Sequence, residues 1–362
     1  MMKIRESFPL SSIRRQAKAN LAQPTTSFRD ETVVVIGATG VMCSEACKVL
    51  AQLDVGTLVL GVRNVGKAEA LVDEIVTECG IARERILIKQ VDLTSFESTK
   101  AFAADLNKSL PRLDVLLIGS ATNNTKKFVT RDGWEENLQV IHLSCAFLTL
   151  LLLPKLQISA NENHTPTVIS NVSSSAVRMT GPWMKFPAKG SQHPNKPPAP
   201  APAGYLRDMS DGKVIWQIAQ YGVCKIVHYC WLETLSSLLD PGQVHVHSLD
   251  PGCTRSPLST GSVIARAYLK VFGRSPLTCG RAIAHSCLPV ENSHGAMLWD
   301  YEVEKPTSFM KSAKTREMRK VVWDETRSVL EALSPDAVQV YAELDQKGGR
   351  MSSDRFLDSI KN

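Results

Sequence analysis

The sequence predicts an α/β protein built on a single doubly wound parallel sheet with helices on both faces. Short apolar, β-branched segments alternate with helical patterns along nearly the whole chain, as in repeated βαβ units. The first such segment, residues 32–36, runs through a glycine turn at 37–40 into a helical pattern. The 362 residues could form two small domains, but the unbroken alternation favours a single large one.

Breaks in the pattern place the elements. We predict strands at 32–36, 58–62, 86–91, 113–118, 167–172, 244–249 and 295–299. Helices are predicted at 45–50, 65–77, 96–110, 134–156 and 214–239, with charged helices from residue 311 onward. The domain spans 31–345, between a basic, flexible N-terminal tail at 1–30 and a C-terminal tail at 346–362. It contains a proline-rich insertion at 182–204 and an irregular substrate lid at 254–290.

Composition argues against several classes of function. The formal charge of +6 is scattered, and no basic stripe interleaved with aromatics indicates a nucleic-acid site. The longest apolar run, 147–153, is too short to span a bilayer, so we expect no transmembrane segment. His245 and His247 share one face of a strand, but no third ligand at a suitable spacing supports a metal site.

The cysteines and the N-terminal residues indicate the cellular compartment in which we expect the protein. Nine cysteines without a C-x-x-C pair or framework spacing indicate reduced thiols in an intracellular protein, and we expect a cytoplasmic one. The basic, serine-containing first twenty residues also have the look of a mitochondrial presequence. Pro9 and a poor apolar face favour a disordered lead-in instead.

The glycine turn and the next strand end suit a dinucleotide. Gly37 and Gly40 let the backbone approach a pyrophosphate, and the following helix offers free N–H groups, although an ordinary turn would look similar. About twenty residues on, where an acidic residue would hold the ribose of NAD, the chain has Arg63, Asn64 and Lys67. A guanidinium suits a 2′-phosphate, which favours NADP(H); the alternative is an ordinary surface arginine.

Two later strand ends fit the same cofactor. Asp92 closes the third strand, where its carboxylate could accept a hydrogen bond from an adenine amino group or cap the next helix. The two roles are compatible. Gly119 and the small residues at 120–121 follow the fourth strand and let its end approach a flat cofactor.

Tyr221 and Lys225 are the candidate acid–base pair. They lie four residues apart in a predicted helix and therefore share one face. The phenol can donate a proton while the neighbouring ammonium favours the phenolate that remains. Because this spacing is common by chance, its significance depends on the glycine turn and on the serines at 173–175 that end the fifth strand.

With these features in place, the chain resembles the short-chain dehydrogenase/reductase family over roughly residues 31–340. It looks like the fungal reductases of secondary metabolism and their retinol-dehydrogenase-like relatives. The segments that carry the resemblance are Gly37-Ala38-Thr39-Gly40, Val62-Arg63-Asn64, Asp92-Leu93, Leu113-Asp114-Val115-Leu116, Asp132-Gly133-Trp134-Glu135, Asn171-Val172-Ser173-Ser174, Tyr221-x-x-x-Lys225 and Pro251-Gly252. Each segment is weak, but their order and spacing together are specific.

The resemblance implies a Rossmann-type sheet of about seven strands with the cofactor across its carboxyl edge. It implies that Tyr221 protonates a carbonyl oxygen, that Ser174 positions that oxygen, and that Lys225 binds the nicotinamide ribose and lowers the tyrosine pKa. The cofactor-binding residues expected from the pattern and the resemblance are Gly37, Thr39, Gly40, Met42, Arg63, Asn64, Lys67, Asp92, Leu93, Gly119, Tyr221, Lys225, Thr254 and Ser256.

The chain departs from the family pattern at residues 118–121, where the family has Asn-Asn-Ala-Gly, and at three further positions. Val41 and Cys43 stand where the family has glycines, and their bulk would crowd the pyrophosphate and the packing of helix on strand. Ile141 replaces an asparagine that anchors a water used to resupply the proton, and its side chain cannot hydrogen-bond. His142 points about 100° further round the helix and is a poor substitute.

These observations favour an NADPH-dependent oxidoreductase that interconverts a ketone or aldehyde with an alcohol on a small hydrophobic metabolite. The altered asparagine and glycines leave a second hypothesis open, a catalytically impaired NADP-binding scaffold or sensor. A third is a lyase, cyclase or epimerase, because the fold also serves non-redox chemistry. The resemblance also leads us to expect a homodimer through the two long helices.

Overall fold

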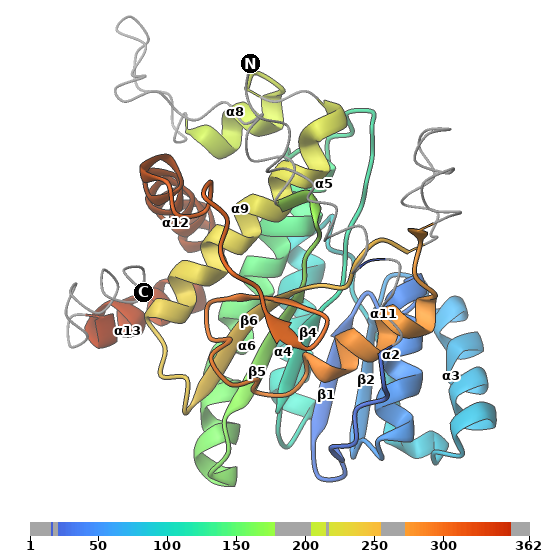
Figure 1. Ribbon diagram of the computed structural model, residues 1–362. Coiled ribbons are helices and arrows are strands. Elements are labelled where there is room, and N and C mark those ends of the chain that lie inside the picture. The colour runs from blue at the N-terminus through green and yellow to red at the C-terminus, as the bar shows by residue number, and fades with distance from the viewer. Residues whose placement is uncertain (1–15, 17–20, 178–203, 215–216, 255–271, 349–362) are drawn as a thin grey trace, which may run out of the picture.

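The fold was analysed in a computed structural model, which describes residues 16, 21–177, 204–214, 217–254 and 272–348 (Figure 1). Most of the expected proline-rich insertion, Ser256 and the first part of the expected lid lie outside these ranges.

One eight-stranded sheet forms the centre of the protein. Its strands lie in the order β3-β2-β1-β4-β5-β6-β7-β8. The first seven are parallel, and the short β8 pairs antiparallel with β7. Their bounds are β1 Thr32–Ile36, β2 Thr57–Val62, β3 Ile86–Gln90, β4 Val115–Ile118, β5 Thr167–Val172, β6 Val244–Asp250, β7 Met297–Trp299 and β8 Glu302–Val303. The expected doubly wound parallel sheet is confirmed, with the antiparallel β8 as an addition.

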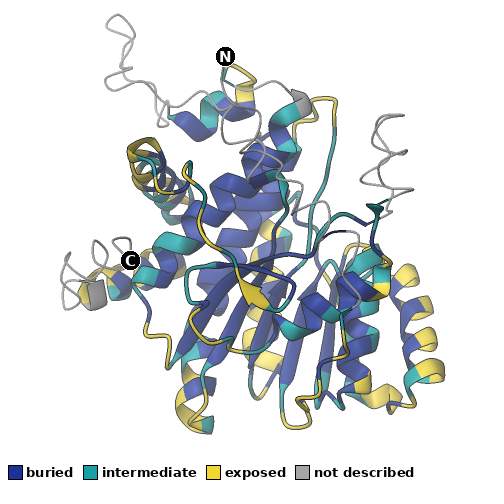
Figure 2. Cartoon of the chain, viewed as in Figure 1, coloured by how far each residue is buried: buried dark blue, intermediate teal, exposed yellow. Residues whose placement is uncertain are grey.

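Helices cover both faces of this sheet. On one face lie α2 (Val41–Gln52), α3 (Val65–Cys79) and α11 (Pro276–His285). On the other lie α4 (Phe96–Ser109), α6 (Ser144–Asn163) and α9 (Gln217–Ser237). Every residue of β1, β4, β5 and β6 is buried, because strands between two helical layers have no solvent face (Figure 2). A short 3₁₀ turn, η2 (Arg83–Arg85), leads into β3.

The helix predicted at 134–156 is longer and less regular than expected. It begins as α5 (Glu136–Leu138), continues through the π-turn η3 (Gln139–Leu143) and runs as α6 to Asn163, with Pro154 inside it. By length and composition, residues 136–163 form the single described helix that could cross a membrane, but 94% of its most apolar window is buried inside the protein. A core helix passes this composition test because it is apolar on every side.

Two C-terminal helices complete the layer over the α6–α9 face. The helix α12 (Ala313–Leu333) packs on α9, and α13 (Pro335–Gly348) packs on α6 (Figure 1). The short α8 (Tyr205–Asp211), which the sequence pattern did not predict, lies against α5 and α12. The long helices on which a homodimer was expected are therefore partly covered by the chain's own C-terminal part.

The structure adds detail at two of the expected boundaries. The N-terminal tail was expected to extend to residue 30, but Phe28 is fully buried and its main chain bonds to both Leu53 and Gly56. The irregular lid was expected to extend to residue 290, but α11 packs closely on α2 as part of the core. The strong amphipathic pattern of α11, capped by Ser275 and begun by Pro276, explains why it forms a regular helix.

The space between α2 and the end of β4 shows how Cys43 replaces a glycine. Cys43 is buried against Gly119, and a Cβ atom added at Gly119 would lie 2.2 Å from the Cys43 sulfur. The expectation that the thiol would crowd helix against strand is therefore wrong, because the missing side chain at Gly119 leaves room for it.

This pairing predicts a coupled effect on stability. Gly119→Ala should lower the free energy of unfolding by about 2 kcal/mol, since overpacking a core typically costs 1–3 kcal/mol. Cys43→Ala removes the atom in conflict, so the same change in that background should cost clearly less. Denaturant unfolding of the two single variants and the double variant measures the coupling. Equal losses in both backgrounds would contradict the pairing.

Candidate active site

The turn between β1 and α2 presents main-chain donors at the carboxyl edge of the sheet. Gly37 has a positive φ of 80°, and a Cβ atom there would lie 2.7 Å from the Ser120 hydroxyl, so only glycine fits. Gly40 precedes α2 without a side-chain cap, and the first turn holds no acidic residue. The N–H groups at the start of α2 are therefore suited to an anion.

The side chains nearest this turn are moderately accessible. Thr39, Val41 and Met42 are half-buried and Gly40 is exposed. Val41 occupies the first position of α2, where it does not interrupt the helix.

The end of β2 places three expected cofactor residues together. Arg63, Asn64 and Lys67 are all exposed. Asn64 caps α3, because its Oδ1 accepts from the Lys67 N–H at 2.9 Å. The Arg63 carbonyl accepts from the Gln90 side chain at 3.1 Å, which fixes the main chain of Arg63 and leaves its guanidinium at the surface.

Asp92, at the end of β3, bonds to the neighbouring Thr94 and does not cap α4. Its Oδ1 accepts from the Thr94 N–H at 3.0 Å and the Thr94 hydroxyl at 2.8 Å. The cap of α4 is instead Ser95, whose hydroxyl accepts from the Ser98 N–H at 3.2 Å. The helix-capping role considered for Asp92 is therefore wrong. Leu93 is buried, and its carbonyl accepts from the Ser144 hydroxyl at 2.7 Å.

Ser174 and Tyr221 meet directly. Ser174 follows β5, and its hydroxyl lies close enough to the phenol of Tyr221, in the first half of α9, to lower the pKa of that phenol. The same hydroxyl accepts from the Ala176 N–H at 3.2 Å, which holds the serine in place. The two residues that sequence analysis assigned to one substrate oxygen are thus in contact.

Lys225 lies one turn after Tyr221 and is almost fully buried. Its Nζ donates to the Val172 carbonyl at 2.6 Å, which ties α9 to the end of β5. Burial lowers the pKa of Lys225 to about 8, while the neighbouring thiols of Cys145, Cys43 and Cys224 act in the opposite direction. The ammonium can therefore release and regain a proton close to neutral pH.

The pKa of Tyr221 differs from the expected lowering. Burial raises it to about 12, and the Ser174 hydroxyl lowers it by less than burial raises it. The charges of Asp250 and Cys253 raise it further. Lys225 is not among the groups that shift this pKa, and its ammonium donates to the Val172 carbonyl.

The π-turn contains both Ile141 and His142. Ile141 is buried in the apolar core, so an asparagine placed there would bury an amide among hydrocarbon side chains. The His142 Nε2 lies 2.8 Å from the Thr326 hydroxyl, and its Nδ1 lies 3.4 Å from the Nδ1 of His228. Burial lowers the pKa of His142 to about 3, so this imidazole is neutral and bonded to α12 and α9.

A buried ion pair that sequence analysis missed stabilises the turn after β6. Arg274 donates to the Pro251 carbonyl at 3.1 Å and pairs with Asp300. The Thr254 hydroxyl donates to the Arg274 carbonyl at 3.0 Å, so it is engaged within the fold. Ser256 lies outside the described residues. No motif marks an arginine and an aspartate 26 residues apart as partners.

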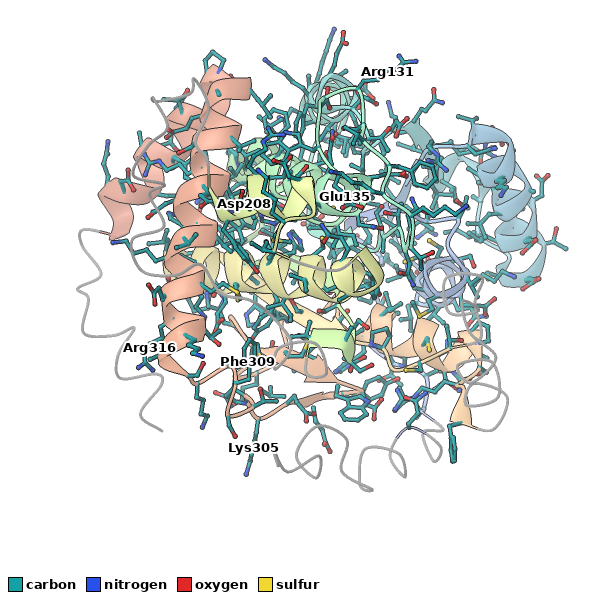
Figure 3. All side chains as sticks on the ribbon, turned by 90° about the horizontal axis from the view of Figure 1, so that it is seen from above. Arg131, Glu135, Asp208, Lys305, Phe309 and Arg316 are labelled. Carbon is teal, nitrogen blue, oxygen red and sulfur yellow. The ribbon has the colours of Figure 1, made fainter. Side chains whose placement is uncertain are left out.

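A second clasp that sequence analysis missed fixes α8 beside the site. The Glu325 carboxylate of α12 accepts from the Tyr205 and Leu206 N–H groups at 2.7 and 2.8 Å. At the other end of α8, the Ser210 hydroxyl accepts from the Glu135 N–H at 2.8 Å. Glu135 and the α8 residue Asp208 lie next to each other in the view from above (Figure 3).

His245 and His247 have structural partners in the core. Both rings lie within 2.9 Å of the Ser293 hydroxyl, and the His247 Nε2 donates to the Ser286 carbonyl at 2.6 Å. Burial lowers the pKa of both histidines, so they are neutral. They tie β6 to the segment between α11 and β7.

The sequence is similar to a family model and to curated fungal proteins. The model described as short chain dehydrogenase matches residues 31–186. The short chain dehydrogenase macD of Penicillium terrestre is 28% identical, over 82% of this chain and 89% of its own. The short-chain dehydrogenase/reductase tropG of Talaromyces stipitatus is 27% identical, with coverages of 84% and 92%. The short chain dehydrogenase sol3 of Alternaria solani is 29% identical, with coverages of 76% and 90%.

Solved structures share the fold at low identity. A protein of Mycobacterium paratuberculosis superposes with a TM-score of 0.59 at 18% identity, over 86% of this chain and 98% of its own. A short chain dehydrogenase of Shigella flexneri, solved in complex with NADP, gives a TM-score of 0.55 at 18% identity, with coverages of 77% and 99%.

The family model covers the glycine turn, strands β1 to β5 and Ser174, while the relatives extend over Tyr221, Lys225 and most of the rest. Strand order and the contact between Ser174 and Tyr221 agree with that match. The family model and the curated relatives together support the assignment of this chain to the short-chain dehydrogenases/reductases, a group of oxidoreductases.

Proposed function

We propose that the protein is an NADPH-dependent reductase that interconverts a ketone or aldehyde with an alcohol. The observation that carries this proposal is the proximity of the Ser174 hydroxyl to the Tyr221 phenol, whose pKa it lowers, with Lys225 one turn further along α9. A carbonyl oxygen that gains negative charge needs a proton donor, an orienting hydroxyl and a nearby cation. These three groups converge at the carboxyl ends of β5 and β6.

The surrounding residues fit a nicotinamide dinucleotide phosphate. Gly37 and the uncapped start of α2 suit a pyrophosphate, and Gly119 lets the end of β4 lie close to Cys43 of α2. The exposed guanidinium of Arg63, with Lys67 nearby, suits a 2′-phosphate. When bound, the cofactor supplies a hydride to the substrate carbon, or accepts one in the reverse reaction.

The protein's own groups manage the proton. With its pKa raised to about 12, Tyr221 is protonated at neutral pH and is ready to donate to the substrate oxygen. Ser174 donates to or accepts from the same oxygen and keeps it within reach of the phenol. Lys225, whose pKa is lowered to about 8, can then return a proton to the tyrosinate.

The substrate that we propose is a small hydrophobic metabolite of fungal secondary metabolism. We propose that the reaction takes place in the cytoplasm. The similarity to short-chain dehydrogenases and reductases of Penicillium, Talaromyces and Alternaria supports the setting. The nine free thiols, seven of them buried, fit a reducing compartment.

A cofactor-binding scaffold is the second candidate. Ile141 favours it, because an apolar side chain stands where the resemblance implies a hydrogen-bonding asparagine. The two candidates share cofactor binding and differ in hydride transfer, so NADPH fluorescence titration followed by a carbonyl panel separates them. Binding without NADPH oxidation for any carbonyl would favour the scaffold.

Tyr221→Phe should lower kcat at least about 100-fold, the range expected for loss of a general acid. NADPH affinity should change little, because Phe keeps the ring in place. Tyr229→Phe is the matched control: it lies on the same helix, its hydroxyl donates to the Gly295 carbonyl at 3.4 Å, and it should leave kcat unchanged. An unchanged rate in Tyr221→Phe would refute the role of the phenol.

Arg63→Ala should weaken NADPH binding about 10- to 100-fold and leave NADH binding nearly unchanged, since it removes a charge-assisted bond to the extra phosphate alone. The control is Arg83→Ala, a half-exposed arginine of the same β2-α3-β3 unit that bonds Glu69 and the Ile86 carbonyl. Isothermal titration of both cofactors against both variants gives the answer. Equal losses for NADPH and NADH would contradict selection by Arg63.

A further inference from the structure

The strand end beneath Lys225 carries polar side chains on the face that α9 covers. Along β5, Val168 and Val172 face the α2–α11 side, whereas Ile169 faces the α6–α9 side. Because side chains alternate along a strand, Asn171 and Ser173 face α9. Ser173 continues the extended chain, since its N–H donates to the Leu249 carbonyl at 2.7 Å.

These two side chains have unpaired atoms in a buried place. The Asn171 amide donates to the Ser248 hydroxyl at 3.1 Å, but its Oδ1 has no hydrogen-bond partner among the described residues. The Ser173 hydroxyl likewise has none within those residues. Both side chains are at most 4% exposed, and they flank Val172, whose carbonyl accepts from Lys225.

The helix above contributes a third unpaired atom. His228 follows Lys225 by three residues, so the two share one face of α9 with Tyr221. The His228 Nδ1 faces His142 at 3.4 Å, while its Nε2 is buried with no partner in the described part of the chain. Burial and the charge of Lys225 both keep this imidazole neutral, because each lowers its pKa.

Unpaired buried polar atoms are costly, so these atoms on the strand and the helix that Lys225 joins call for a partner. Buried water typically bonds about three otherwise unpaired polar groups, and it is the partner that fits both hydroxyl and acceptor atoms. We propose that Asn171, Ser173 and His228 hold water beneath Lys225, and that this water returns the proton that Tyr221 gives to the substrate. The second half of this proposal rests on the proposed function.

Reduction moves one hydride to the substrate carbon and the phenolic proton of Tyr221 to the substrate oxygen. The tyrosinate regains a proton from the Lys225 ammonium, and the resulting amine takes one from the buried water. The hydroxide left by that transfer is reprotonated from solvent. Water can reorient between proton transfers and so donate again in the next turnover. The three side chains position it and relay no proton themselves.

In this arrangement, residues from other elements take over the water-holding role of the asparagine that the resemblance implies at position 141. The polar atoms come from β5 and α9, whereas Ile141 belongs to the apolar side of the π-turn. The loss at position 141 therefore does not leave Lys225 without a proton source.

Asn171→Leu and Ser173→Ala test this inference, because each removes an unpaired atom with little change in volume. Enzyme premixed with NADPH should complete the first turnover at the wild-type rate, since Tyr221 carries its own proton. Later turnovers should slow about tenfold or more, as expected when proton supply becomes limiting, and should show a larger solvent deuterium effect. Ser170→Ala is the matched control, since this serine of the same strand faces away and bonds Ser286 at 2.8 Å.

A first turnover that slows as much as the later ones, or a steady-state rate equal to wild type, would overturn the proton role. A high-resolution crystal structure tests the water site independently of activity. Water bonded to Asn171 Oδ1 and Ser173 Oγ supports the site, and its absence there refutes it. In one further outcome, wild-type protein shows this water and yet fails to oxidise NADPH with every carbonyl tested. That result would refute the proposed function and, with it, the proton role.

Discussion

The buried ammonium of Lys225 is the constraint on which the site depends. A cation in a protein interior must be hydrogen-bonded, and here it finds the Val172 carbonyl at the end of β5. That bond fixes the helix α9 relative to the strand, so that Tyr221, one turn earlier, reaches Ser174. The same burial that would destabilise the charge also brings its pKa into the range in which the lysine can exchange protons.

Much of the fold could be predicted from the sequence because its causes are local. Strands buried on both faces need continuous apolar, β-branched residues, and such runs marked six of the parallel strands closely. Tyr221, Lys225 and Ser174 could be found because helical spacing and strand ends are visible in the chain. The contact between the phenol and the serine follows from the fold that these patterns specify.

What could not be predicted depends on pairs of residues that are distant in the chain. The sequence warned that Cys43 would crowd the helix, but only the structure shows that Gly119 makes room for it. Position 141 was read as a missing hydrogen bond, whereas the unpaired atoms of Asn171, Ser173 and His228 lie on other elements. The Glu325 clasp on α8 escaped notice for the same reason, since 120 residues separate the carboxylate from Tyr205.

That clasp has a consequence for how the chain can vary. Val177 is buried beside the end of β5, and on the far side of residues 178–203 the start of α8 is bonded to Glu325. Because a Cβ atom at Gly204 would meet the Glu325 carboxylate at 2.3 Å, the chain must re-enter the fold at this point. Both ends of the segment are anchored, and loop entropy grows only slowly with length. Proteins of this design can therefore shorten, lengthen or exchange that segment without refolding the catalytic helix.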